Sequence, residues 1–390
     1  MKQKCSAAVF FLAAVMGVIF PASLPAEGPV ISGILDTKVS FSAGAGEMPD
    51  FSYGIEEYAN LRMRSTVGDR GTIYAAFNLI AAAGAGAFTA SLTPEGSAGS
   101  GASALVTGDN YSAALDLERL YFRVNSDFLD VEAGLMRLAF GYGQVWRPSD
   151  FLNPRNPLFP DLRPRAVLGG TVAVYPSETM KIQGFGAAPR NSLNLHGSGA
   201  VAGAAGDMHW ERLSMQALYA YESPREETPL GLHRGGLSLK AELELGFILD
   251  LMYLYNHDTE PGIRGLSASA GFDYSFYDGR FYVLAEYLYS GAESVTSGEF
   301  SNRNYIYGMV LYRFTDYTNL SLACMASIDD VSFSPVVTLE HDLFQGMTLS
   351  LTGRVPLDRD LFSGDGNHGE LGPDNSGTRL LVSAAVRFRF

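Results

Sequence analysis

The segment from Tyr142 to Arg165 holds the residues whose types and spacing are best suited to select among small charged molecules. It carries four arginines against two aspartates, although the protein as a whole is acidic. Charges that line a narrow, partly desolvated passage are screened less than charges on an open surface, so a few of them can outweigh the overall balance. The candidate selectivity residues are Arg147, Asp150, Arg155, Asp161, Arg163 and Arg165.

The same segment is too rich in proline to form a regular strand. It contains five prolines, two of them in Asn-Pro steps, and the residue before each proline is restricted to extended conformations. We therefore expect a stiff, ordered loop. Its aromatic residues Trp146, Phe151 and Phe159 favour burial, so the loop should be anchored against its surroundings. A loop that packs on neighbouring loops and takes no part in selection is the alternative.

Catalytic chemistry finds little support in the sequence. No glycine-rich phosphate loop, CxxC pair or HExxH motif is present. The histidines fall mostly near expected turns or in loops, and none is paired with a serine or aspartate at an informative spacing. We therefore expect no enzyme and no cofactor. The six histidines are His196, His209, His233, His257, His341 and His368.

An acidic run near the C-terminus is a candidate for Ca²⁺, which takes several carboxylate oxygens. Its members are Asp358, Asp360, Asp365, Glu370 and Asp374. Their spacing does not match the EF-hand pattern, and solvated surface charge explains them more simply. We expect no metal site.

The elements that must position these residues are strands. Leu237, Leu239 and Ala241 alternate with Ser238 and Lys240, and the same period of two recurs along the chain, whereas a helix would repeat every 3.6 residues. The pattern predicts about 18 strands, with 16 as the alternative count. The expected strands lie at about 29–43, 52–67, 70–83, 110–125, 128–141, 165–177, 179–188, 198–206, 209–222, 232–244, 245–257, 263–276, 279–290, 304–315, 318–329, 331–343, 346–357 and 378–390.

The connections between these strands alternate in length. Tight turns are expected at Gly68–Gly71, at Tyr277–Arg280 and around Asp207. The connections on the other side are longer and polar, and they comprise 84–110, 142–164, 291–304 and 357–377. Short turns at one end and long loops at the other are typical of a transmembrane β-barrel, whereas a soluble sandwich has no reason to sort its loops.

The last strand carries a further signal. From Phe390 back through Phe388 and Val386 to Leu380, every second residue is apolar. A terminal Phe after alternating apolar residues resembles the C-terminal signal of Gram-negative outer-membrane β-barrels, which their assembly machinery reads. The resemblance implies an all-β fold, a transmembrane antiparallel barrel of the porin type in the cell outer membrane. It also implies contacts with outer-membrane lipid and the barrel-assembly machinery, with Phe388 and Phe390 as the assembly signal.

The amino terminus fits export. Lys2 and Lys4 precede an apolar run from Ala7 to Phe20, and small residues follow up to Ala26, which is the layout of a signal peptide. We expect residues 1–26 to be the signal peptide and 27–390 to form one barrel. After the leader only Cys324 remains, so no disulfide within the monomer is expected.

The composition excludes some partners and leaves others open. With 28 basic against 42 acidic residues, binding of nucleic acid is disfavoured because phosphate contacts need a basic surface. In a barrel the polar phase of each strand faces the lumen, and here it is too charged for a dry core. The candidate lumen-lining residues are Arg62, Arg64, Lys240, Glu242, Asp250 and Arg354.

These features together predict a porin-like channel for passive or weakly selective uptake of small polar solutes, with the 142–165 loop folded into the lumen as a constriction. A transporter of hydrophobic compounds resembling the long-chain fatty-acid channels is one alternative. Those channels carry an N-terminal hatch, whereas here the strand pattern starts near Leu35. An adhesin that uses the loop at 84–110 is another alternative. Assembly into a homo-oligomer stays open.

Overall fold

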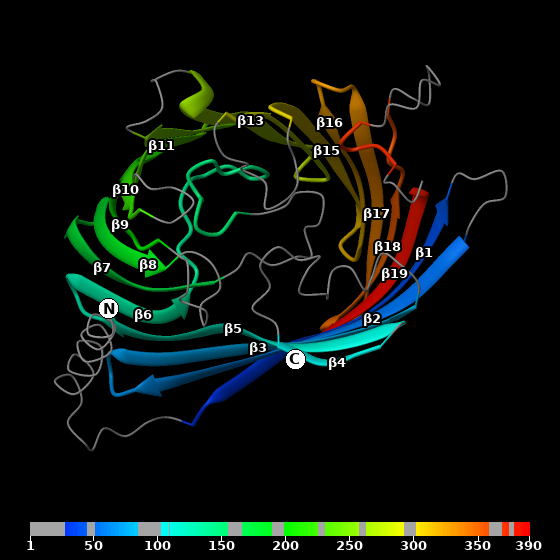
Figure 1. Cartoon of the computed structure of the whole chain (residues 1–390), viewed down its shortest axis with the longest axis horizontal. Helices are drawn as coiled ribbons and strands as arrows, with labels where there is room; N and C mark the ends of the chain where they lie inside the picture. The colour runs from blue at the N-terminus through cyan, green and yellow to red at the C-terminus, as the bar shows by residue number, and fades with distance from the viewer. Residues whose placement is uncertain are drawn as a thin grey trace.

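The structure is a computed structural model that describes residues 28–44, 51–84, 103–108, 110–154, 166–188, 199–224, 231–256, 263–291, 302–358, 369–373 and 378–390. Strands make up nearly all of its regular structure (Figure 1). The elements are β1 (Val30–Gly44), β2 (Phe51–Val67), β3 (Gly71–Gly84), β4 (Ser103–Thr107), β5 (Tyr111–Asn125), β6 (Leu129–Met136), β7 (Val167–Ser177), β8 (Met180–Ala188), β9 (Val201–Trp210), β10 (Leu213–Glu222), β11 (Leu232–Glu242), β12 (Gly246–Asn256), the 3₁₀ turn η1 (Ile263–Gly265), β13 (Leu266–Phe276), β14 (Phe281–Tyr289), β15 (Asn304–Thr315), β16 (Thr318–Ser327), β17 (Ser332–Phe344), β18 (Met347–Arg354) and β19 (Thr378–Arg389).

The strands close into a barrel. Apart from β4, which pairs only with β5, every strand pairs antiparallel with two neighbours in the ring, and β1 meets β19 to complete a ring of 18 strands. The ring leaves no open edge along that seam, so the backbone groups of a lipid-embedded wall find partners. The predicted all-β antiparallel barrel and its strand count are confirmed. None of the helical turns in the part of the chain that the structure describes is long and apolar enough to cross a membrane.

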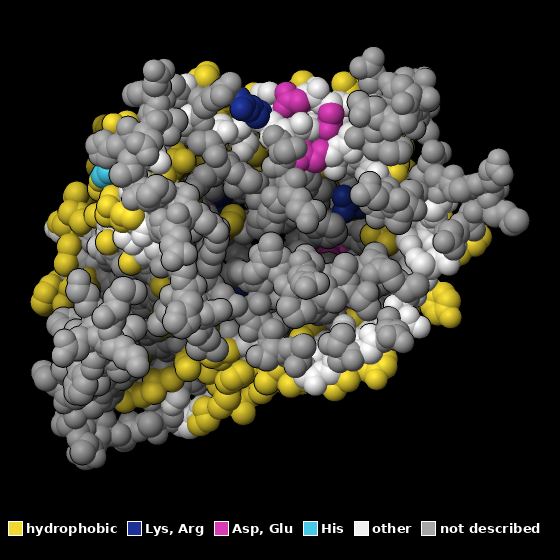
Figure 2. Space-filling view, viewed as in Figure 1, with side chains coloured by type: hydrophobic (Ala, Val, Ile, Leu, Met, Phe, Trp, Pro, Cys, Tyr) yellow, Lys and Arg dark blue, Asp and Glu magenta, His cyan; other side chains and the backbone are white. Residues whose placement is uncertain are grey.

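The two faces of the wall differ as the alternation predicts. On β1, Leu35 and Val39 are exposed on the outside, while Asp36 and Lys38 occupy the inward phase. Hydrophobic side chains follow the outer edge of the ring in Figure 2. An apolar outer wall around a polar interior is the arrangement of a barrel that sits in lipid.

Strand β4 falls where the sequence predicts only a loop, between residues 84 and 110. β6 pairs with β5 only from Leu120 to Asn125, because the chain leaves the wall after Met136. The first residues of β5 are thereby left without that neighbour, and β4 pairs with them from Leu115 to Ser112. This pairing could not be seen in the sequence because it depends on where β6 stops.

Two boundaries also differ from the prediction. The strand expected at 128–141 ends at Met136, since the following residues turn into the barrel. The turn expected around Asp207 is wrong: β9 runs on to Trp210, and the chain reverses at Glu211, whose φ is 50°. Asp207 instead serves as a cross-strand acceptor, because Gln216 Nε2 donates to its Oδ1 at 2.6 Å. The tight turns expected at 68–71 and 277–280 are confirmed.

The seam between β1 and β19 ends on Phe390. Its backbone N–H donates to Gly33 O at 3.1 Å, and Gly33 N–H donates back to Phe390 O at 2.8 Å. A Cβ atom on Gly33 would meet the Phe390 ring, so glycine is required where the terminal ring crosses β1. The ring of Phe388 stacks beside it at 6.0 Å between centroids. The last residue is therefore part of the wall.

Candidate functional site

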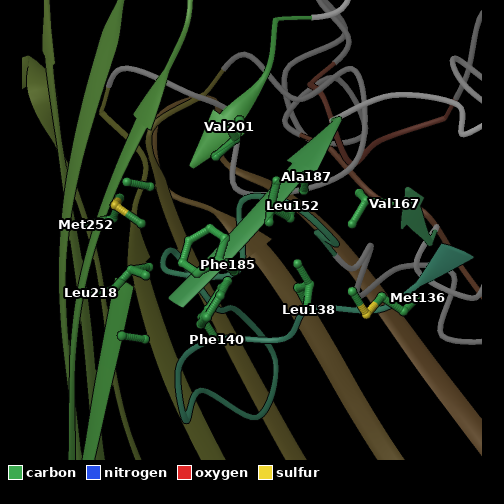
Figure 3. Packing of buried hydrophobic residues seen from close by; sticks show 12 residues of the cluster. Met136, Leu138, Phe140, Leu152, Val167, Phe185, Ala187, Val201, Leu218 and Met252 are labelled. Atoms are coloured by element: carbon green, nitrogen blue, oxygen red, sulfur yellow. The ribbon is translucent and has the colours of Figure 1, made fainter. Parts of the chain in front are cut away.

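Residues 137–154, which we call the lumen segment, leave the wall after β6 and run inside the ring of strands (Figure 1). Asn153 Oδ1 accepts a hydrogen bond from Leu138 N at 2.8 Å, which joins the two ends of the segment. Leu138 and Phe140 are buried against the inner wall, and the ring of Phe140 lies 4.9 Å from that of Phe185 on β8 (Figure 3). The first part of the segment is thus packed against β7 to β12.

Gly141 is where the segment passes closest to the wall. Its φ is 80°, a conformation that favours glycine, and a Cβ atom there would meet the carboxylate of Asp250. Its N–H donates to Gln216 Oε1 on β10 at 2.7 Å. Burial and the charge of Asp207 raise the pKa of the neighbouring Tyr142 to about 12, so this phenol is neutral at physiological pH.

Glu286 on β14 binds the backbone of the lumen segment. Its carboxylate accepts three consecutive backbone N–H groups, from Gln144 at 3.2 Å, Val145 at 3.1 Å and Trp146 at 2.8 Å. Ser269 on β13 adds its hydroxyl at 3.1 Å. Hydrogen bonds to an ionised acceptor are the stronger kind, and Glu286 is only 2% exposed. One wall carboxylate therefore fixes three residues of the segment.

Asp250 on β12 makes a second anchor. Its Oδ1 accepts a hydrogen bond from the Ser149 hydroxyl of the lumen segment and another from Ser238 on β11, the latter at 2.8 Å. The two serine oxygens lie 3.3 Å apart. Since Asp250 is fully buried, its charge depends on these donors for stabilisation. The segment is held to the wall on both sides of Trp146.

Trp146 is the hydrophobic centre of the segment. Only 1% of its surface is exposed, and its ring packs near Tyr305 and Tyr307 on β15, with centroids 6.4 and 6.3 Å away. Leu371, from the connection between β18 and β19, belongs to the same buried cluster. The burial expected for this tryptophan is therefore observed, and part of it comes from a distant connection.

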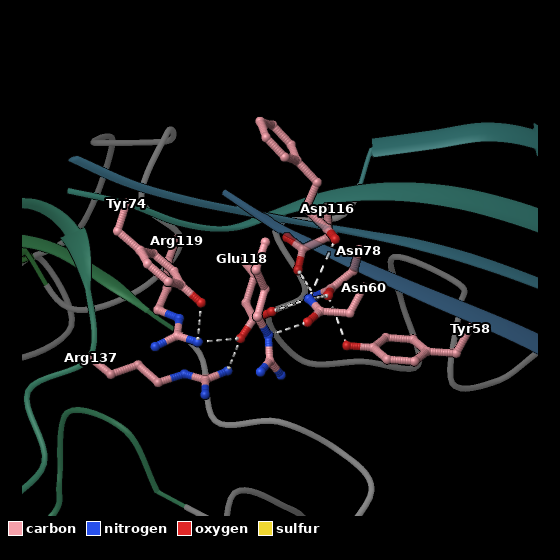
Figure 4. Close-up of polar contacts among 10 residues, drawn as sticks. Tyr58, Asn60, Tyr74, Asn78, Asp116, Glu118, Arg119 and Arg137 are labelled. Carbon is pink, nitrogen blue, oxygen red and sulfur yellow. Dashed lines mark hydrogen bonds and ion pairs between the residues drawn. The ribbon is translucent and has the colours of Figure 1, made fainter. Parts of the chain in front are cut away.

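A polar cluster lies on the inner side of β2, β3 and β5 (Figure 4). Asn60 Nδ2 donates to Asn78 Oδ1 and to Glu118 Oε2, both at 2.6 Å. Glu118 is also approached by two guanidinium groups, those of Arg137 at 3.0 Å and Arg119 at 3.4 Å. We call the set the wall cluster, and its members are Tyr58, Asn60, Arg62, Tyr74, Asn78, Asp116, Glu118, Arg119 and Arg137.

The wall cluster brings positive charge to the lumen. The guanidinium of Arg119 lies 4.8 Å above the Tyr74 ring and donates to its hydroxyl at 3.1 Å. Arg62 donates to Asn60 Oδ1 at 2.6 Å. Such contacts hold long side chains in one geometry, so the charges have fixed positions along the wall. Arg137 is the first residue of the lumen segment, which places the segment next to this cluster.

Two of the six candidate selectivity residues lie in the described part of the chain. Arg147 bends back so that its Nε donates to Gly143 O at 2.5 Å, and Asp150 is buried with 2% of its surface exposed. The other four lie outside the described residues, and they are Arg155, Asp161, Arg163 and Arg165.

The candidate lumen-lining residues are spread over the inner wall. Arg62 belongs to the wall cluster, Arg64 is exposed, and Lys240 pairs with Glu242. Arg354 donates to Ser334 at 2.8 Å, whereas Asp250 is covered by the lumen segment.

The sequence reasoning missed Glu286, Gln216 and Glu118. One signal was available for Glu286, because it is a single charge between leucines in the inward phase of its strand. The roles of the other two depend on how the segment crosses the lumen, which no local pattern reveals.

Two members of the acidic run near the C-terminus, Asp358 and Glu370, are not the solvated surface charges that the sequence predicts. Asp358 is only 2% exposed, and Glu370 accepts the hydroxyl of Tyr305 at 2.7 Å. The other members, Asp360, Asp365 and Asp374, lie outside the described residues. Within the described ranges, no group of three or more His, Cys, Asp or Glu side chains is placed to hold a metal ion.

The fold of this chain is similar to that of known proteins, although its sequence is not. No protein-family model matches the sequence, and no curated protein matches it. Solved structures do match. They include a BenF-like porin from Pseudomonas fluorescens (TM-score 0.57, 9% identity, 93% of this chain and 99% of that one). They also include two Pseudomonas aeruginosa proteins, OccK2 (0.56, 10%, 93% and 97%) and OccK7 (0.55, 13%, 92% and 98%).

At these identities the likeness establishes the fold. The chain has the closed barrel of an outer-membrane porin along nearly its whole length, and its outer wall is apolar. The predicted fold and the predicted location in the outer membrane are confirmed.

Proposed function

We propose that the protein is a channel for small polar solutes and that the lumen segment narrows its passage. The observation that carries the proposal is the binding of three consecutive backbone N–H groups by Glu286. A barrel of this size leaves an aqueous lumen unless something fills it. A segment fixed by its backbone to the inner wall reduces the width while the rest of the lumen stays open.

Solutes that bear a carboxylate are the class that the charges favour. Arg62 and Arg119 stand on the inner wall, Arg137 and Arg147 lie on the lumen segment, and the residues that follow it, 155–165, carry three more arginines. Guanidinium groups recognise carboxylates through two parallel hydrogen bonds. Among the similar structures, OccK2 was also solved in complex with glucuronate, a sugar acid.

Recording in planar bilayers tests the proposal. A channel gives stable open steps, whereas a transporter of hydrophobic compounds or an adhesin gives little or no conductance. The fold is that of channels, and we propose accordingly that the chain is not an enzyme. A folded protein that produces no steps in repeated reconstitutions would overturn the proposed function.

Assembly is proposed to depend on the C-terminal strand, with Phe388 and Phe390 read by the barrel-assembly machinery. The support is the seam described above, in which Phe390 completes the pairing with Gly33. Residues 1–26, which lie outside the described residues, are proposed to be the signal peptide that precedes this step.

Deletion of Phe390 should leave export intact and reduce insertion, because the seam loses two backbone hydrogen bonds and the apolar stripe loses its end. The measurement is the amount of folded, heat-modifiable protein in the outer membrane. Replacement of Phe390 by Tyr, which keeps the ring and the backbone pairing, is the control and should insert normally. Equal amounts with and without Phe390 would contradict the assembly role.

A further inference from the structure

The segment Gly369–Pro373, which we call the strap, belongs to the connection between β18 and β19 and reaches the buried cluster around Trp146. We propose that the strap is a positioning element that holds the lumen segment in place from the loop end of the barrel, opposite the tight turns. The proposal rests on the proposed function of the lumen segment and adds a second, distant part of the chain to the control of its position.

Asp330, between β16 and β17, ties the strap to the barrel rim. Its Oδ2 accepts the backbone N–H of Glu370 and the side-chain amide of Asn302, both at 2.6 Å. Its Oδ1 accepts the hydroxyl of Ser332 at 2.7 Å, and the Ser332 oxygen in turn accepts Leu371 N–H at 3.0 Å. Two successive backbone groups of the strap are therefore bound by one short turn.

Glu370 adds contacts of its own. Its Oε2 accepts the hydroxyl of Tyr305 at 2.7 Å and the backbone N–H of Asn302 at 3.2 Å. Asn302 precedes β15, so the connection before β15 is joined to the strap as well. Two other connections at this end of the barrel therefore bind the strap, whereas a solvated acidic loop would make no such contacts.

The glycines of the strap permit this close approach. A Cβ atom on Gly369 would lie 2.5 Å from the Cβ of Ser332. A Cβ atom on Gly372 would lie 2.5 Å from the carboxylate of Asp358, which is itself buried. Contacts this short would force the neighbouring side chains or the strap itself to shift, so glycine at these two positions permits the close packing.

Leu371 is the residue of the strap that contacts the lumen segment. It is 1% exposed and packs in one cluster with Trp146, Leu288, Tyr305 and Met325. Trp146 is also the residue whose N–H makes the shortest of the three bonds to Glu286. Removal of Leu371 or of its tether therefore loosens the side chain that lies beside the main backbone anchor.

The test compares two neighbouring carboxylates in the same turn. Asp330→Asn should weaken the tether of the strap, because a charged acceptor is lost. Asp329→Asn is the matched control, since Asp329 accepts only from Arg303 and Asn304 among the bonds described for it and does not contact the strap. Leu371→Ala removes the contact itself.

Fluorescence of Trp146 is the readout. The chain has two tryptophans, and the other, Trp210, is exposed on the outer wall, so all variants carry Trp210→Phe. With the folded barrel in detergent, Asp330→Asn and Leu371→Ala should shift the emission to the red and raise quenching by acrylamide several-fold. Asp329→Asn should match the unsubstituted protein in both.

The proposed role of the strap would be overturned by an unchanged Trp146 signal in both Asp330→Asn and Leu371→Ala, provided that heat-modifiability shows both barrels to be folded. If Leu371→Ala does not fold, Asp330→Asn decides. A change of equal size in Asp329→Asn would also overturn it, since the effect would then belong to the rim in general. The fluorescence is measured without any channel recording. Failure of the proposed role of the strap can therefore be distinguished from failure of the proposed channel function.

Discussion

Replacing Glu286 with alanine should enlarge the single-channel conductance several-fold. Three backbone N–H groups lose their common acceptor, and each buried group left unpaired costs about 1–3 kcal/mol. The lumen segment then loses its backbone attachment to β14 and no longer holds the passage at its narrow width. The measurement is the step size in planar bilayers, with the ion selectivity recorded from the same channels.

Glu340→Ala is the matched control for this experiment. Glu340 occupies the inward phase of β17, is exposed to the lumen and has no hydrogen bond to the lumen segment among the contacts described. Its loss removes the same charge from the same wall and should leave the step size nearly unchanged. Equal conductance in Glu286→Ala and the unsubstituted protein would mean that the segment does not limit the passage.

Changing Arg147, Arg155, Arg163 and Arg165 together to glutamine should shift the reversal potential in a salt gradient toward cations. The reason is that charges beside a narrow passage act at short range and are weakly screened. The conductance should change only modestly, because the anchors of the lumen segment at Glu286 and Asp250 remain. The measurement is the zero-current potential at a fixed salt ratio.

A second quadruple variant controls for total charge. Arg70, Arg212, Arg280 and Arg313 lie on or beside the tight turns, away from the lumen segment. Their replacement by glutamine removes the same number of positive charges, four, and should move the reversal potential much less. If both variants shift it equally, selectivity follows net charge, and the proposed role of the 142–165 arginines is lost.

The sequence was most informative where one local rule applies along a whole element. In β11, apolar residues from Leu237 to Ala241 alternate with polar residues from Ser238 to Glu242. This pattern requires only that one face of the strand be apolar and the other polar, and the strands of the structure follow it. The same rule explains how barrels at 9–13% identity share this fold.

The features that the sequence did not reveal depend on contacts between distant elements. β4 forms because β6 stops early, and Asp207 stays inside a strand because Gln216 faces it. The strap looked like a solvated acidic loop, since its partner Asp330 lies far away in the chain. The proline pattern of the 142–165 loop predicts a stiff loop, but it could not indicate which wall carboxylate would bind the backbone of residues 144–146.

Locking the lumen segment to the wall tests the central proposal most directly. Ser149 and Ser238 have their hydroxyl oxygens 3.3 Å apart, so cysteines at both positions, in a Cys324→Ala background, are close enough to be bridged by oxidation. Single channels of the double variant are then recorded before and after oxidation, with loss of free thiol measured in the same sample. If the segment is a resident constriction of an open channel, the disulfide forms and the oxidised protein conducts in the same steps as the reduced one. Closure of the channel on oxidation, or cysteines that do not bridge in the folded barrel, would contradict it, because the segment would then have to leave the wall for solutes to pass.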